Sequence, residues 1–188
     1  MDSSTTPIKA IRRLPRRIGK IRVIKRIGKR RNTVDQQLFD LINDARLHPE
    51  KYPPNGNASG ASMSACPSAL TLSSQLQEIA RAHNAFLAGQ PIEWVNDDLN
   101  MHRGPGGKLA WEDGEPMSQA GYTAFRAENV ATGFPTAEAA VRFWMQDDER
   151  WNWGHRNLIL NCAAQEFGFA HHEGGPGGHY WTLDMGTR

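Results

Sequence analysis

The chain has 188 residues, 39% of them hydrophobic and 22% charged, and a formal net charge of +2 at pH 7. This length and this ordinary globular composition predict one domain with room for a tail. The sequence has no run of about 18 apolar residues and no apolar signal core of about 7–15 residues, so we expect neither a membrane span nor a readable secretory signal.

The charge is distributed unevenly along the chain. Residues 1–32 hold twelve Lys and Arg against one acid, a formal charge of +11, whereas residues 33–188 hold ten against nineteen, a charge of −9. We therefore divide the chain into a basic arm, residues 1–32, which we expect to be flexible, and a mildly acidic domain, residues 33–188. The arm has isoleucines at steps of three and four, which is the spacing of an amphipathic helix. Three interpretations of it stay open: a disordered tail, a segment that turns helical on an anionic surface, and a damaged leader.

The charge of the arm alone allows nucleic acid, a membrane surface or a wall polymer as its partner, and we expect an anionic membrane or wall surface. Nucleic acid is not expected as a partner, because the domain is acidic and has no recognised nucleic-acid motif.

Three helices are predicted in the domain. The first begins near Asn32 or Thr33 and ends around His48, because Pro49 follows. The second has a capping-box pattern in Ser74 and Gln77, a stop at Gly89, and His83 on its apolar face, where we expect a core histidine satisfied by a neighbour. The third runs from a Thr136 cap to about Asp148, with Trp144 in its buried stripe.

The sequence near the C-terminus predicts a β-hairpin. Residues 166–171 and 179–185 are strand-like, and a Gly-Pro-rich turn at 174–178 separates them. Helices followed by late strands favour an α+β fold over repeated βαβ units. We interpret His171, His172 and His179 as surface histidines of this hairpin rather than as ligands.

The two cysteines, Cys66 and Cys162, have no partner at a metal-binding spacing. A disulfide between them would close a loop of nearly one hundred residues and contribute on the order of 4 kcal/mol. Two buried free thiols are the alternative.

The order of several motifs resembles the CAP superfamily, which includes cysteine-rich secretory proteins, antigen 5 and plant pathogenesis-related proteins, and resembles its bacterial branch most. The resemblance spans residues 34–187. It rests on Leu70–His83, His102, Gly121-Tyr122, Ala127–Gly133, Ala139–Met145, Gly154–Cys162 and Tyr180–Thr182.

This resemblance implies a three-layer α-β-α sandwich with a small, mostly antiparallel sheet. It also implies a cleft of two histidines and two acids: His102, Glu128, His155 and, three residues after the helix tryptophan, Asp147, where animal and plant members have Glu. It implies a disulfide between Cys66 and Cys162, a secreted or cell-envelope location, and no single agreed reaction.

Neutral imidazoles beside carboxylates suit a borderline cation such as Zn²⁺, for which His102 and His155 are the candidate ligands. We expect Asn129, Arg156 and Trp144 to assist ligand binding. A buried polar network in which these groups satisfy one another is the alternative to a site.

Two functions are expected for this cleft. The first, which the resemblance implies, is an extracytoplasmic domain that binds a metal ion, a lipid or an envelope ligand without turnover. The second is a metal-assisted hydrolase of a peptide or wall polymer, with Glu128 as general base and with His155 or Arg156 stabilising the developing charge.

Overall fold

The computed structural model describes residues 33–188, so the basic arm and the expectations for it lie outside the described residues. The helices are α1 (Val34–Leu47), α2 (Ser74–Ala88), α3 (Ile92–Val95), α4 (Pro116–Gln119), α5 (Ala137–Gln146) and α6 (Gly154–Ile159). Short 3₁₀ turns are η1 (Pro49–Lys51), η2 (Asn100–His102) and η3 (Glu149–Trp151). The strands are β1 (Thr71–Leu72), β2 (Phe125–Thr132), β3 (Glu166–Glu173) and β4 (His179–Thr187).

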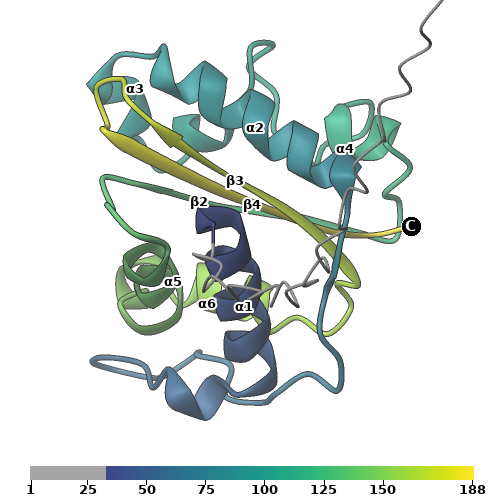
Figure 1. The fold of residues 1–188 in the computed structure, drawn as a ribbon, viewed down its shortest axis with the longest axis vertical. Helices are drawn as coiled ribbons and strands as arrows, with labels where there is room; N and C mark the ends of the chain where they lie inside the picture. Colours follow the sequence, from purple (N-terminus) through teal and green to yellow (C-terminus); the bar gives the residue numbers. More distant parts are fainter. Residues whose placement is uncertain (1–32) are drawn as a thin grey trace, which may run out of the picture. The chain divides into compact units, whose positions relative to one another are not determined.

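The strands form one sheet in the order β1-β3-β4-β2. β4 pairs antiparallel with both β3 and β2, whereas the short β1 runs parallel to β3. In Figure 1, α2, α3 and α4 lie on one side of this sheet, and α1, α5 and α6 lie on the other. This three-layer α-β-α sandwich with a mostly antiparallel sheet confirms the predicted fold class and leaves β2 as an edge strand.

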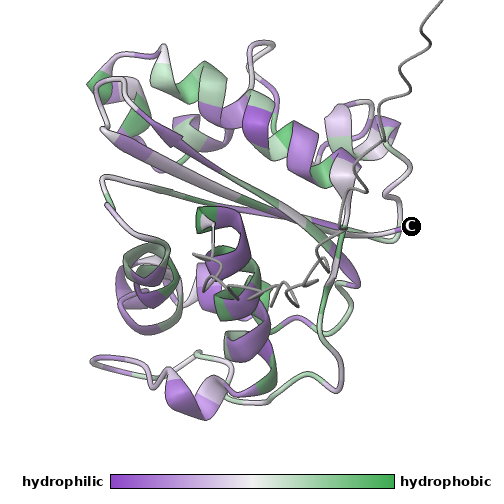
Figure 2. Cartoon of the chain, in the orientation of Figure 1, coloured by the Kyte–Doolittle hydropathy of each residue, from purple (hydrophilic) through white to green (hydrophobic). Residues whose placement is uncertain are grey.

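The helix boundaries follow from local capping chemistry. The Oγ1 of Thr33 accepts a hydrogen bond from the backbone nitrogen of Gln36 at 3.2 Å, and α1 ends at a His48 cap as predicted. The cap of α2 is Ser73, not Ser74, because its Oγ accepts from the backbone nitrogen of Leu76. Figure 2 shows hydrophilic and hydrophobic residues on different sides of α1 and α2, as expected for helices that cover a sheet.

The two faces of the sheet are packed differently. The face towards α1 and α5 carries large buried side chains, among them Phe167 and Phe169 of β3 and Trp181 of β4. On the opposite face α2 approaches the backbone directly, since a Cβ added at Gly168 would lie 2.0 Å from the backbone nitrogen of Gln77. No water-sized space separates helix and sheet at that position.

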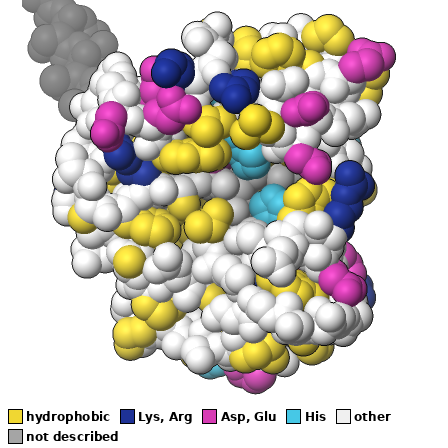
Figure 3. Space-filling view, turned by 180° about the vertical axis from the view of Figure 1, so that it is seen from behind, with side chains coloured by type: hydrophobic (Ala, Val, Ile, Leu, Met, Phe, Trp, Pro, Cys, Tyr) yellow, Lys and Arg dark blue, Asp and Glu magenta, His cyan; other side chains and the backbone are white. Residues whose placement is uncertain are grey.

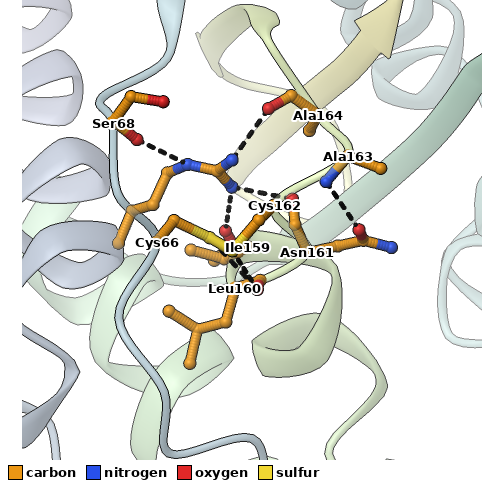
Figure 4. Close-up of a disulfide and its surroundings, with 9 residues drawn as sticks. Cys66, Ser68, Ile159, Leu160, Asn161, Cys162, Ala163 and Ala164 are labelled. Atoms are coloured by element: carbon orange, nitrogen blue, oxygen red, sulfur yellow. Dashed lines mark hydrogen bonds between the residues drawn. A yellow bond between two sulfur atoms is a disulfide. The ribbon is translucent and has the colours of Figure 1, made fainter.

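A disulfide joins Cys66, in the segment before β1, to Cys162, just after α6, with their Cα atoms 5.4 Å apart (Figure 4). It confirms the predicted pairing. The buried guanidinium of Arg46 holds the same two segments, since it donates hydrogen bonds to four backbone carbonyls, those of Ser68, Ile159, Asn161 and Ala164. The chain that precedes β1 and the chain that follows α6 are thus tied both covalently and by hydrogen bonds.

None of the helices within residues 33–188 combines the length and the apolar character needed to cross a bilayer.

Candidate functional site

The predicted cleft lies at the edge strand β2. His102 comes from η2, Glu128 from β2 and His155 from α6, and all three line one cavity of about 370 Å³. Figure 3 shows histidine side chains near the centre of one face, with hydrophobic and charged side chains around them. Residues from three distant parts of the chain therefore line one cavity, as the resemblance implied.

His102 is held by Glu128. Its Nδ1 lies 2.8 Å from Oε1 of Glu128, whose side chain has no exposed surface, while 16% of the His102 side chain remains exposed. The Trp111 ring lies edge-on to the imidazole at 5.4 Å between centroids. Because a carboxylate accepts, the proton of neutral His102 sits on Nδ1, and its Nε2 is an acceptor.

His155 is held in the same way by a different acid from the one expected. Its Nδ1 lies 2.5 Å from Oδ1 of Asp148, which is fully buried and whose Oδ2 accepts from the backbone nitrogen of Arg156 at 3.1 Å. Asp147 is exposed, and its carboxylate accepts from Asn55 instead. The structure brings together His102, Glu128 and His155, but it places Asp148 rather than Asp147 beside them.

The path of the chain between α5 and α6 places Asp148, and not Asp147, beside His155. α5 ends at Gln146 with Asp147 as its exposed cap, and the next residue, Asp148, is fully buried. After η3, Asn152 and Trp153 adopt positive φ angles of 51° and 62°, a conformation that costs non-glycine residues on the order of 1 kcal/mol each. The Trp153 Nε1 donates to the carbonyl of Asn57, which helps to hold the reversal that delivers α6 to the cleft.

Both imidazoles therefore have Nδ1 on a buried carboxylate and Nε2 without a hydrogen bond in residues 33–188. Carboxylates behind metal-ligating histidines fix the ring and its tautomer in this way. Within the described part of the chain, however, no group of three or more His, Cys, Asp or Glu side chains is arranged to hold a metal ion.

The sequence matches the family model of the cysteine-rich secretory protein family, CAP, over residues 39–185. This chain belongs to the CAP family. An outer surface protein of Borrelia burgdorferi has a similar fold, with a TM-score of 0.55 and 14% identity over 82% of this chain and 92% of that one.

Two further solved structures match less well. A cysteine-rich secretory protein from Staphylococcus aureus gives a TM-score of 0.46 and 18% identity over 86% of this chain, which spans only 41% of that protein. The CAP domain of the enterococcal protein PrgA gives 0.48 and 15% identity, over 84% and 61% of the two chains. A comparison with curated protein sequences gives no match.

Of the expected ligand-binding residues of this CAP domain, only Asn129 lines the cavity. Its Nδ2 donates to the carbonyl of His155 at 3.0 Å, and its buried Oδ1 has no partner within residues 33–188. Trp144 is buried in the core, where its Nε1 donates to the carbonyl of Val130. The tryptophans that wall the cavity are Trp111 and Trp151.

Arg156 also points away from the cavity. Its buried guanidinium donates to the carbonyls of Tyr52, Ser62 and Met145 at 2.6 Å each, and burial lowers its pKa. The residue therefore joins three segments of the scaffold.

The other histidines lie outside this cavity. His83 is buried, as predicted, with Nε2 2.8 Å from the carbonyl of Met101 and 3.8 Å from Oε1 of Glu128. It lies behind the cleft and lines a separate, mostly apolar cavity of about 440 Å³. On the hairpin, His171 Nε2 lies 3.1 Å from His179 Nδ1, and the His171 ring stacks on Trp181.

Proposed function

We propose that this CAP domain is an extracytoplasmic binding domain whose cleft takes a divalent cation such as Zn²⁺ between His102 and His155, together with a small lipid or another envelope ligand. The observation that supports this proposal best is the shared arrangement of the two imidazoles. Each has Nδ1 on a buried carboxylate and Nε2 free of partners in residues 33–188, at the wall of one cavity.

The donor set is small, so a cation would be held weakly. Protein zinc sites commonly use three or four protein ligands, whereas the cavity is lined by two imidazoles, those of His102 and His155. Bound there, the cation would supply a positive charge and open coordination positions for water or for a donor atom of the ligand. Trp111 and Trp151 provide the apolar walls against which the rest of the ligand would pack.

We do not propose hydrolysis. A general base must reach the water that it activates. The Glu128 side chain has no exposed surface, and its Oε1 is already occupied by His102. Binding without turnover is therefore the simpler reading of the cleft.

Three observations support a secreted or envelope location. The chain has a disulfide that closes a long loop, and disulfides persist in oxidising compartments. The matching family is named for secretory proteins. The similar structure from Borrelia burgdorferi is described as an outer surface protein.

The cation site is tested by titrating Zn²⁺ into the purified full chain in a calorimeter. We expect binding by the wild type and loss of it in a His102→Ala, His155→Ala double variant. Unchanged affinity in the double variant would remove the cleft as the site. His48→Ala, at an exposed histidine outside the cleft, is the matched control and should bind like the wild type.

The role of Asp148 as the carboxylate behind His155 is tested by two matched variants. Asp148→Asn removes the charge behind His155 and should weaken Zn²⁺ binding roughly tenfold or more. Asp147→Asn makes the same chemical change at the exposed neighbour and should leave the affinity unchanged. Equal effects of the two substitutions would contradict the assignment.

For the arm we propose an anionic membrane or wall surface as partner. Vesicles containing anionic phospholipid should bind the full chain more strongly than a chain that lacks residues 1–32. The difference should vanish as salt rises, since exposed charges are screened within about 8 Å at physiological ionic strength. Binding that survives the deletion would refute this role.

A further inference from the structure

Asp184 is a buried carboxyl group that the cleft, as described so far, does not use. It lies in β4, directly opposite Glu128 of β2 and Gly168 of β3. The residue is fully buried, and neither of its carboxyl oxygens has a partner within residues 33–188. The Oε2 atom of Glu128 is also buried without a partner there.

These two unpaired groups are neighbours. Directly opposite residues of antiparallel strands have Cβ atoms about 5 Å apart and point to the same face of the sheet. α2 covers that face, and its backbone comes within 2.0 Å of the position that a Cβ on Gly168 would take. The two carboxyl groups are within hydrogen-bonding reach of each other, and this contact is one of the causes that raise the pKa of Asp184.

Two carboxylates cannot share such a site while both are ionised. Burial first, and then the charge of Glu128, raise the pKa of Asp184 well above its ordinary value. Oε1 of Glu128 is already occupied, because it lies 2.8 Å from Nδ1 of His102 and 3.8 Å from Nε2 of His83. A single proton on Asp184 then satisfies both carboxyl groups.

We propose that Asp184 is a positioning residue for the cleft: its protonated carboxyl group donates a hydrogen bond to Oε2 of Glu128. This bond fixes the orientation of the Glu128 carboxylate, so that its Oε1 keeps accepting the Nδ1 proton of His102 and Nε2 is left as an acceptor at the cavity wall. The effect on Zn²⁺ affinity rests on the proposed function, whereas the protonation of Asp184 does not.

The protonation state is tested by infrared difference spectroscopy of the metal-free full chain at pH 7. We expect one carbonyl stretch of a protonated carboxyl group, which disappears in Asp184→Asn. The exposed Asp147→Asn is the matched control and should keep the band. A wild-type spectrum without the band, or a band that survives in Asp184→Asn, would overturn the proposal.

The coupling to His102 is tested by ¹⁵N NMR of its ring in the same metal-free protein. In Asp184→Asn the side-chain amide still donates to Glu128, so His102 should keep the Nδ1–H tautomer and the Zn²⁺ affinity should change less than twofold. In Asp184→Leu the donor is gone, the Glu128 carboxylate loses its fixed orientation, and His102 should shift towards the Nε2–H tautomer. An unchanged tautomer in Asp184→Leu would show that Asp184 does not position His102.

The Zn²⁺ affinity of Asp184→Leu should fall about tenfold, a typical effect of groups behind metal ligands. If Asp184→Leu does not fold, the Asp184→Asn spectra still decide the protonation state. If the wild type binds no Zn²⁺, the proposed cation site is wrong, and the infrared band and tautomer still test Asp184 independently.

Discussion

Removing the disulfide should lower the stability of the protein by an amount that depends on the number of residues between its two cysteines. Cys66 and Cys162 are 96 residues apart in sequence. In the chain-entropy account, a cross-link over such a loop stabilises the folded state by about 4.5 kcal/mol. For a domain of this size each kcal/mol changes Tm by about 2–4 °C, so a Cys66→Ala, Cys162→Ala double variant should melt roughly 9–18 °C lower.

We expect the double variant still to fold. Arg46 ties the same two segments through its hydrogen bonds to four backbone carbonyls, and these contacts do not depend on the sulfur atoms. The loss should therefore come mainly from the greater freedom of the unfolded chain, with the native contacts retained.

The assay is thermal unfolding by calorimetry, with and without reducing agent. Reduced wild type should match the double variant, and the reducing agent should leave the double variant unchanged. A decrease in Tm of less than about 4 °C would refute the loop-entropy reasoning. It would mean that the unfolded chain already keeps these segments close together.

Three further predictions concern stability. Arg46→Met removes the donor from four backbone carbonyls, two of them in buried hydrogen bonds, and should cost at least about 3 kcal/mol in urea unfolding. Arg142→Met, at an exposed arginine, should stay within about 0.5 kcal/mol. Gly168→Ala should cost about 3 kcal/mol or more, because its Cβ meets the α2 backbone, while Gly106→Ala, with open space around it, should be nearly neutral. Burial and the neighbouring imidazole of His179 lower the pKa of His171 from its ordinary value of 6.5. The unfolded state therefore binds more protons than the folded state, and the stability of the fold should decrease as the pH drops below about 6.5. Between pH 7 and pH 5 the Tm of His171→Gln should therefore decrease less than the Tm of the wild type. Equal decreases in the two proteins would contradict the expected contribution of His171 to the pH dependence of stability.

The sequence predicted those elements whose signal is local. Thr33 and Pro49 bracket α1 because capping and the loss of a backbone donor act within one turn. The hairpin was predicted from aromatic strands on either side of a glycine-rich turn, although both strands run two residues further than expected, to Glu173 and Thr187.

Strand β2 was not predicted, although it carries Glu128. Five successive residues of the strand, Ala127 to Ala131, are buried. The alternation of apolar and polar residues that marks a half-exposed strand is therefore absent. Only the resemblance to a family pointed to Glu128.

The choice between Asp147 and Asp148 depends on where a helix ends, and two adjacent acids give no local signal for that choice. Trp111 falls in an irregular stretch without periodicity, so its place at the cavity wall follows from tertiary packing alone.

The orientation of α6 has a consequence for how the cleft responds to its ligand. His155 faces the cavity, while the next residue, Arg156, anchors the same helix to three separate segments on the other side. The imidazole is consequently preorganised, and little conformational entropy remains to be lost when a ligand arrives. Free and occupied forms of the protein should therefore superpose closely around this helix, with association rates governed by diffusion into the cleft and not by its rearrangement.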